Sequence, residues 1–251
     1  MYVMTYRQTD TYRIRSGEID ANGRLSVPAL MNMMQESANR NALDYSIGIA
    51  DLARQGFGWV LMRLRINLHR YPLYGQSIRI TTYPTAVDKY FIYRDFTVLA
   101  EDGTRLADAC STWLTFSMER RTMVPLPEFI RQITLPTDVN SRLQLPPKPD
   151  FLPPDGQPAR SVDVGWYDID QNQHTNNVAY VQWLLETVDD ATLQMKQLSE
   201  LDVFFRTESR WHDRLLIRSR LESSESWLHG IEHATTGKDV LLARSRWRNS
   251  F

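Results

Sequence analysis

The feature that most constrains this 251-residue sequence is an internal repeat. Shifting the chain by 150 residues lays residues 19–36 on residues 169–186, and five of the 18 aligned positions are identical. Later residues match at smaller offsets: Gly75–Ile80 with His212–Ile217 in pattern, then Gly103 with Gly237, Ala109 with Ala243, Ser111 with Ser245 and Trp113 with Trp247. The matches keep their order while the offset shrinks, as loop deletions in a second copy would produce. The sequence therefore predicts a tandem duplication of one fold.

A proline-rich segment separates the two copies. Seven of the 12 prolines lie between Pro136 and Pro158. Because proline lacks a backbone donor and disfavours helix, an extended connector is expected there. We therefore predict an N-terminal domain over residues 1–135, a linker over 136–159 and a C-terminal domain over 160–251.

Each copy shows one early helix followed by strands. Ser26 and Pro28 are typical of a helix start, and Asn176 or Asn177 of a second one. Apolar residues then recur at helical spacing: Leu30, Met33, Met34 and Ala38 in the first copy, and Val178, Val181, Leu184, Leu185 and Val188 in the second. Strands are predicted over 60–68, 77–83, 90–99, 106–118, 201–205, 214–221, 227–233 and 240–247. This order predicts an α+β fold with an antiparallel sheet, built twice.

The strand over 60–68 shows the clearest period-two pattern. Its apolar residues are Val60, Met62, Leu64, Ile66 and Leu68, and they alternate with Arg63, Arg65 and Asn67. This alternation predicts a half-buried strand whose polar side chains lie on the face opposite the apolar ones.

Composition narrows the classes of function. The chain is 42% hydrophobic and 24% charged, which is typical of a globular protein, and its net charge of -1 gives no global field toward nucleic acid or anionic membrane. The single cysteine, Cys110, excludes an intrachain disulfide framework and a cysteine-based metal site. The pattern shows no membrane span or signal peptide. We therefore expect a soluble cytoplasmic protein that needs no metal or bound cofactor.

The densest polar cluster is residues 168–177, directly before the second predicted helix. Asp170, Asn172 and His174 alternate along it, so their side chains converge if the loop is extended and curls into the helix. Backbone N–H groups at a helix start stabilise developing negative charge, and a carboxylate or imidazole beside them would assist attack of water on an acyl carbonyl. A capping loop with a solvent-facing histidine is the alternative interpretation.

The repeat bears on this choice. The first copy keeps Asp20 and Asn22 but has Arg24 at the position of His174. A loop with a purely capping role would be equally suitable in both copies, whereas loss of the one group that titrates near neutrality fits one catalytic copy and one binding copy. Asp20 and Asn22 would then have a structural role in a turn.

The loop and the helix after it resemble the signature of acyl–acyl-carrier-protein (acyl-ACP) thioesterases. The matching positions are Asp168, Asp170, Asn172, His174, Asn176, Asn177, Val178, Tyr180, Trp183, Leu185 and Glu186. The resemblance extends over almost the whole chain, including residues 12–20 and the tandem layout. It implies two hot-dog domains, each a long helix wrapped by an antiparallel sheet, packed as a pseudo-dimer within one chain.

The resemblance also implies catalytic residues. The catalytic Asp, Asn and His of the family fall on Asp170, Asn172 and His174, and a further catalytic Glu falls on Glu208. Ser209 stands where plant members have Cys, so a Cys–His–Asn mechanism would need Ser209 as its nucleophile. We therefore favour attack by water, assisted by His174 and the carboxylates.

Substrate contacts follow from the same resemblance. The acyl chain is expected in the first copy, against an apolar slot lined by Leu30, Met33, Met34 and Trp59, with Met31 and Met62 as neighbours. Asn176 and Ser209 are expected to contact the substrate beside the catalytic groups. The implied partner is an acidic acyl carrier protein, met by exposed arginines. A second copy of the chain, forming a homodimer, is compatible with the sequence.

Three rival functions are open at this point. Acyl-CoA hydrolases with a single hot-dog domain share part of the motif, although the tandem chain argues against them. Hot-dog hydratases have two residues, one of them proline, between Asn and His, whereas only Gln173 separates Asn172 from His174 here. A non-catalytic acyl-binding module is the third.

Overall fold

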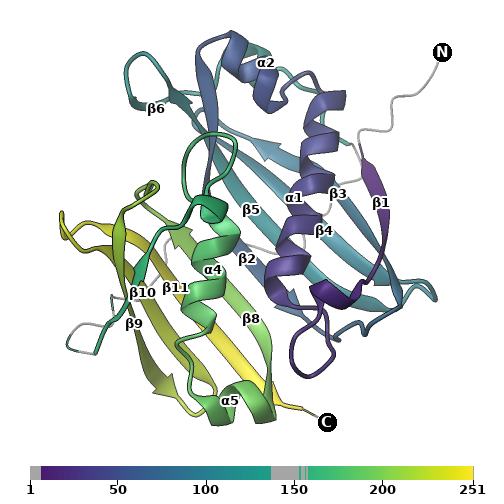
Figure 1. The fold of residues 1–251 in the computed structure, drawn as a ribbon. Helices are drawn as coiled ribbons and strands as arrows, with labels where there is room; N and C mark the ends of the chain where they lie inside the picture. Colours follow the sequence, from purple (N-terminus) through teal and green to yellow (C-terminus); the bar gives the residue numbers. More distant parts are fainter. Residues whose placement is uncertain (1–6, 137–152, 154–155, 157, 251) are drawn as a thin grey trace. The chain divides into compact units, whose positions relative to one another are not determined.

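The computed structural model describes all residues except 1–6, 137–152, 154–155, 157 and 251 (Figure 1). The chain divides into two compact units, Met1–Leu145 and Pro146–Phe251. Most of the predicted linker, residues 136–159, lies outside the described residues. No helix in the described part of the chain is long and apolar enough to cross a membrane.

The first unit packs a long helix on an antiparallel sheet. Its helices are η1 (Ser16–Glu18), α1 (Val27–Asp44), α2 (Ile49–Arg54) and α3 (Glu128–Arg131). Its strands are β1 (Gln8–Arg13), β2 (Phe57–Leu68), β3 (Ser77–Val87), β4 (Phe91–Ala100), β5 (Arg105–Ser117) and β6 (Thr122–Val124). They pair in the order β1-β3-β4-β5-β2, with β6 added to β5. Helix α1 crosses the face of this sheet and contacts β3 and β1 (Figure 1).

The second unit repeats this plan. Its helices are η2 (Trp166–Asp168), α4 (Asn177–Leu185) and α5 (Asp190–Met195), and its strands are β7 (Arg160–Asp163), β8 (Lys196–Phe205), β9 (Arg214–Ser223), β10 (Ser226–His233) and β11 (Asp239–Asn249). They pair antiparallel in the order β7-β9-β10-β11-β8, which is the order of the first unit strand for strand. The predicted α+β fold and its duplication are confirmed, and each unit has the helix-on-sheet arrangement of a hot-dog domain.

The helix starts follow the predicted capping. Ser26 is the N-cap of α1 and accepts the N–H of Ala29, and Asn176 is the N-cap of α4 and accepts the N–H of Val178 at 3.0 Å. The end of α4 differs from the predicted stripe. Val188 is buried but lies beyond the helix, because α4 ends at Leu185 and the Thr187 hydroxyl donates to the Leu184 carbonyl in the following turn.

Strand β2 departs from the predicted alternation. A β-bulge between Leu61 and Arg63 shifts the register, so Leu61 and Arg63 are both buried and Met62 is only half-buried. The predicted pattern resumes beyond the bulge, where Leu64, Ile66 and Leu68 are buried. A bulge adds one residue to one strand, and period-two counting from the sequence does not detect it.

Candidate active site

Asp170 organises the loop that precedes α4. Its Oδ1 accepts the backbone N–H of Asn172 at 2.8 Å and that of His174 at 3.3 Å, and its Oδ2 accepts the side-chain amide of Asn172 at 3.3 Å. The Asp170 N–H donates to the His174 carbonyl at 2.8 Å, and Gln173 closes the turn with a φ of 63°. The Asp170 carboxylate thus holds the backbone of His174, while its interactions with Asn172 occupy the remaining oxygen.

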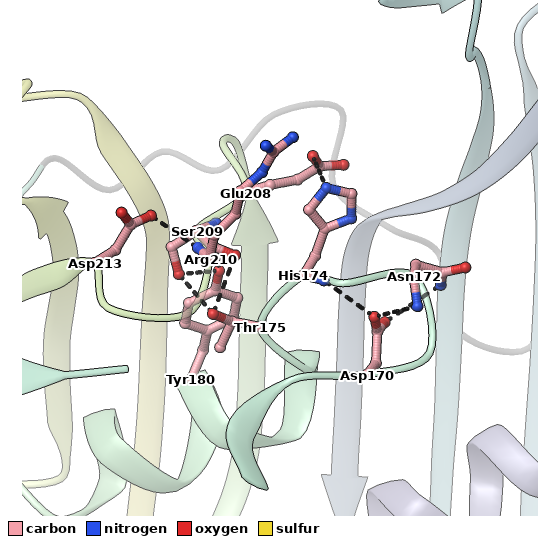
Figure 2. Close-up of polar contacts among 9 residues, drawn as sticks. All are labelled: Asp170, Asn172, His174, Thr175, Tyr180, Glu208, Ser209, Arg210 and Asp213. Carbon is pink, nitrogen blue, oxygen red and sulfur yellow. Dashed lines mark hydrogen bonds and ion pairs between the residues drawn. The ribbon is translucent and has the colours of Figure 1, made fainter. Parts of the chain in front are cut away.

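The side chains of His174 and Glu208 form a close pair. His174 Nε2 lies 2.9 Å from Glu208 Oε2, and the two side chains are 27% and 46% exposed. Figure 2 shows the His174 ring and the Glu208 carboxylate meeting, with Asp170 and Asn172 farther along the loop that carries His174. A carboxylate only accepts hydrogen bonds, so Nε2 is the nitrogen that carries a proton in this contact, and the tautomer with its proton on Nε2 has a lone pair on Nδ1. Among the described residues, none bonds Nδ1.

A buried hydroxyl network joins the two loops that carry this pair. The hydroxyl of Thr175 donates to the Ser209 carbonyl at 3.1 Å and lies 2.7 Å from Ser209 Oγ, which in turn lies 2.8 Å from the Tyr180 hydroxyl. Since each hydroxyl carries one proton, Tyr180 O–H donates to Ser209 Oγ and Ser209 O–H to Thr175 Oγ1. The Ser209 N–H donates back to the Tyr180 oxygen at 2.9 Å. Burial raises the pKa of the Tyr180 hydroxyl, so it stays protonated as this network requires.

Ser209 is therefore placed inside the protein. Ser209 is 1% exposed. In Figure 2 it lies below Glu208, next to Thr175 and Tyr180. Its backbone carbonyl also accepts the N–H of Thr175 at 2.9 Å. Ser209 follows Glu208 in the sequence, and Thr175 follows His174. The hydrogen bonds between Ser209 and Thr175 therefore fix Glu208 relative to His174.

The first unit contains the same loop without a histidine–glutamate pair. Asp20 Oδ1 accepts the N–H groups of Asn22 at 2.8 Å and Arg24 at 3.0 Å, and Gly23 has the φ of 74° that corresponds to Gln173. Arg24 stands in the place of His174, and its guanidinium lies 5.3 Å from the centre of the Tyr71 ring. The N–H of Leu25 bonds to the Pro72 carbonyl as Thr175 bonds to Ser209, so Tyr71 is the counterpart of Glu208. Sequence comparison did not pair these two residues, although the offset of 137 that joins Gly75 to His212 would have done so.

Comparison with known proteins identifies the family. The family model described as the acyl-ACP thioesterase N-terminal domain matches residues 5–134, and that of the C-terminal domain matches residues 154–249. The chain belongs to the acyl-ACP thioesterase family.

Individual relatives agree with this assignment. An acyl-[acyl-carrier-protein] hydrolase of chloroplasts from Cuphea viscosissima is 28% identical over 265 residues, which cover 98% of this chain and 63% of the relative. Two solved structures share the fold. The 12:0-ACP thioesterase from Umbellularia californica has a TM-score of 0.87 at 23% identity, with full coverage of both chains. An acyl-ACP thioesterase from Bacteroides thetaiotaomicron has a TM-score of 0.82 at 24% identity, covering 99% of this chain and 100% of that one.

The predicted acyl-chain residues of this acyl-ACP thioesterase family member lie in the first unit. Leu30, Met33 and Met34 are buried on the face of α1 that packs on the sheet. Trp59, on β2, is half-buried; its Nε1–H donates to the Ile47 carbonyl at 2.9 Å, and its ring packs with the apolar cluster around Leu52. The structure thus packs Trp59 against the α2 region and buries the three α1 residues in the core. Contact of these four residues with an acyl chain stays a prediction.

Two buried basic residues in this family member escaped the sequence analysis. Arg94, on β4, donates to Asn41 Oδ1 at 2.8 Å and to the Thr82 hydroxyl at 3.2 Å, and burial lowers its pKa to about 10. His229, on β10, lies between the hydroxyls of Ser219 at 2.6 Å and Ser245 at 2.8 Å, and burial lowers its pKa to about 3. Within the described residues, no cluster of three or more His, Cys, Asp and Glu side chains could hold a metal ion.

Proposed function

We propose that this protein hydrolyses the thioester of fatty acyl-ACP to a free fatty acid and the carrier-protein thiol. The names of its relatives as acyl-ACP hydrolases and thioesterases support the substrate class. The observation that carries the chemistry is the 2.9 Å contact between His174 and Glu208, because the twin loop keeps the backbone hydrogen bonds of the turn and lacks both of these groups.

His174 acts as the general base in this proposal. Its Nδ1 lone pair accepts a proton from water, whose oxygen forms a bond to the thioester carbonyl carbon. The carbonyl electrons move onto oxygen, and the tetrahedral intermediate then expels the thiol sulfur, which takes the proton back from His174. Glu208 accepts the Nε2–H throughout, so it orients the ring and stabilises the imidazolium that forms.

The start of α4 supplies hydrogen-bond donors for the oxyanion. The N–H of Val178 is already satisfied by the cap residue Asn176. The N–H of Asn177, the first residue of the helix, has no acceptor within the part of the chain that the structure describes. We assign the Asn177 N–H to the developing oxyanion, where the helix dipole adds to its effect.

The other motif residues position these groups. Asp170 and Asn172 hold the loop that presents His174, and Ser209 holds Glu208 beside it. Asn176 fixes the first turn of α4, next to the proposed oxyanion donor. Because the Ser209 hydroxyl is buried and engaged on both sides, this arrangement supports attack by water and gives Ser209 a structural role.

The acyl chain, in this proposal, contacts the apolar side chains that the first unit provides around Leu30, Met33, Met34 and Trp59. Long, flexible methionine side chains adapt to a flexible ligand. Replacing Met33 with a bulkier aromatic residue should shorten the preferred acyl chain. An unchanged chain-length profile would refute the assignment of Met33 to the acyl-chain site.

The proposal is tested by release of free thiol from a series of saturated acyl-ACPs, from octanoyl to stearoyl. The His174→Ala variant should lower kcat by about two to four orders of magnitude on the best substrate. The matched control is Arg24→Ala, which changes the equivalent position of the twin loop and should keep kcat within about twofold of wild type. Equal activity of His174→Ala and wild type, or no release from any acyl-ACP by a folded protein, would contradict the proposal.

A further inference from the structure

The second unit exposes a cluster of aromatic rings beside the catalytic pair. Trp166 and Tyr167 belong to η2 and are 56% and 99% exposed, and Trp211, 47% exposed, precedes β9. The Trp166 and Trp211 rings meet edge to face with centroids 5.0 Å apart, and His212 stacks on Trp211 at 4.0 Å. We call Trp166, Tyr167, Trp211 and His212 the aromatic platform. Exposed apolar patches of this kind mark interaction sites in soluble proteins.

The platform is fixed to the loops that carry His174 and Glu208. The Asp168 carbonyl, next to Tyr167, accepts the N–H of Asn176 at 2.7 Å, and the Ser209 carbonyl, two residues before Trp211, accepts the N–H of Thr175 at 2.9 Å. The two platform loops are also bonded to each other, since Val164 exchanges backbone hydrogen bonds with residues 212 and 213 at 3.1 and 2.9 Å. The rings are therefore held in place before any ligand binds.

A further set of contacts orders the turn that presents Trp211 and His212. The Asp213 carboxylate accepts the N–H of Arg210 at 2.8 Å and lies 3.3 Å from His233 Nε2. Figure 2 shows this turn directly beside Glu208 and Ser209. The turn that presents Trp211 and His212 thus follows Glu208 and Ser209 directly along the chain.

The twin unit shows that the fold does not require the rings of Trp166 and Tyr167. Ser16 and Gly17 of η1 occupy the places of Trp166 and Tyr167. The N–H of Gly75 donates to the Ile14 carbonyl as the N–H of His212 donates to the Val164 carbonyl. Gly75 has a φ of 79°, and His212 adopts a φ of 71° although it is not a glycine. The second unit therefore carries Trp166, Tyr167 and a left-handed histidine where small residues serve the first, whereas Trp211 has an exposed aromatic counterpart there, Tyr74.

We propose that the aromatic platform binds the pantetheine arm of the acyl-ACP substrate. This inference rests on the proposed function. The arm is bonded to the thioester sulfur, so it must cross the surface next to His174 when the carbonyl is in place. Up to its terminal phosphate it is a neutral chain of methylenes, two amides, a hydroxyl and a pair of methyl groups. Ring faces suit the methyl and methylene groups, and the indole N–H and phenol O–H groups suit the amide carbonyls.

The charge of the surface favours the neutral arm over an acidic protein face. Arg206 is paired with Asp239, and Arg214 with Asp163 at 2.6 Å. Arg210, next to Trp211 in the sequence, has no ion-pair partner in the described chain, and Figure 2 shows it pointing toward Glu208. Docking of the carrier protein itself on these rings is the alternative that the experiment separates.

The experiment compares Trp211→Ala and Trp166→Ala with wild type on one acyl group carried by three thiols. Acyl-ACP and acyl-CoA contain the whole pantetheine arm, whereas the acyl-N-acetylcysteamine thioester ends after the first amide. The platform variants should lower kcat/KM about tenfold on the first two and leave the third within about twofold. Tyr74→Ala is the matched control, because Tyr74 is the twin-unit counterpart of Trp211 and is 63% exposed.

Three other outcomes on an active enzyme overturn the inference. A loss of kcat/KM on acyl-ACP alone would assign the rings to docking of the carrier protein. An equal loss on all three substrates would indicate a disturbed catalytic loop. No loss on any substrate would show that the rings do not bind the arm. If wild type hydrolyses none of the three, the proposed function fails, and binding of coenzyme A is then followed by isothermal titration calorimetry. A response that Trp211→Ala abolishes would support the platform, and no response in wild type would refute it.

Discussion

The role of Ser209 gives the sharpest test of how the site is built. Truncation to alanine removes the acceptor of the Tyr180 O–H, while Thr175 still donates to the backbone carbonyl at 3.1 Å and the residue-209 N–H still donates to Tyr180 at 2.9 Å. One buried hydroxyl is thus left unsatisfied. That loss costs about 1–3 kcal/mol of unfolding free energy, because the group is desolvated without a replacement partner.

Stability and turnover should respond to this change very differently. In a chain of this length, about 2 kcal/mol corresponds to a fall in Tm of roughly 4–8 °C. Turnover should fall by less than about tenfold, since Glu208 and His174 keep their contact. Removing a serine nucleophile lowers kcat by about a millionfold in a serine hydrolase.

The assay is urea unfolding together with thiol release from acyl-ACP, on wild type and Ser209→Ala. Tyr180→Phe is the companion variant, because it breaks the same network by leaving the Ser209 N–H without its acceptor. Loss of turnover by three or more orders of magnitude in Ser209→Ala, with unchanged stability, would refute the structural role and establish covalent catalysis.

Three further variants test separate parts of the structure. Glu208→Gln keeps the size of the side chain and removes its charge, so kcat should fall about 10- to 30-fold from the loss of a charge-assisted hydrogen bond, and wild-type kcat would show that the carboxylate is dispensable. Gln173→Gly should leave stability unchanged or raise it by up to about 1 kcal/mol in urea unfolding, because relief of a left-handed conformation outweighs the entropy that glycine adds to the unfolded chain; a loss of stability would contradict this. His229 has a folded pKa of about 3 against an ordinary 6.5, so stability is lost as pH falls below about 6.5, by about 1.4 kcal/mol per pH unit. His229→Gln should remove the contribution of one proton from the slope of unfolding free energy against pH, between about pH 4 and 6. An unchanged slope would contradict the buried, neutral state of His229.

The repeat and the hydrophobic periodicity predicted the architecture well. The strands from β3 to β5 and from β9 to β11 lie where alternation placed them, and Ser26 and Asn176 cap their helices as predicted, because these signals are local. The bulge at Arg63 and the early end of α4 were not predicted. Both depend on contacts with neighbouring strands and turns, which a single segment does not encode.

The candidate site was predicted in its residues and not in its contacts. The structure brings together His174 and Glu208, which are 34 positions apart in the sequence and which the family resemblance had named as catalytic. Spacing alone suggested that Asp170 acts beside the His174 ring, whereas its carboxylate holds the loop backbone. The buried hydroxyls of Thr175 and Tyr180, the Tyr71 counterpart of Glu208 and the Trp166–Trp211 contact arise from folded loops, so no pattern in the sequence indicated them.

The most direct test of the central claim, that His174 and Glu208 act as one catalytic unit, is a double-mutant cycle on kcat for acyl-ACP hydrolysis. The account predicts that Glu208→Gln added to His174→Ala changes kcat by less than about twofold, because Glu208 acts only through the His174 ring. Independent losses that multiply in the double variant would contradict it.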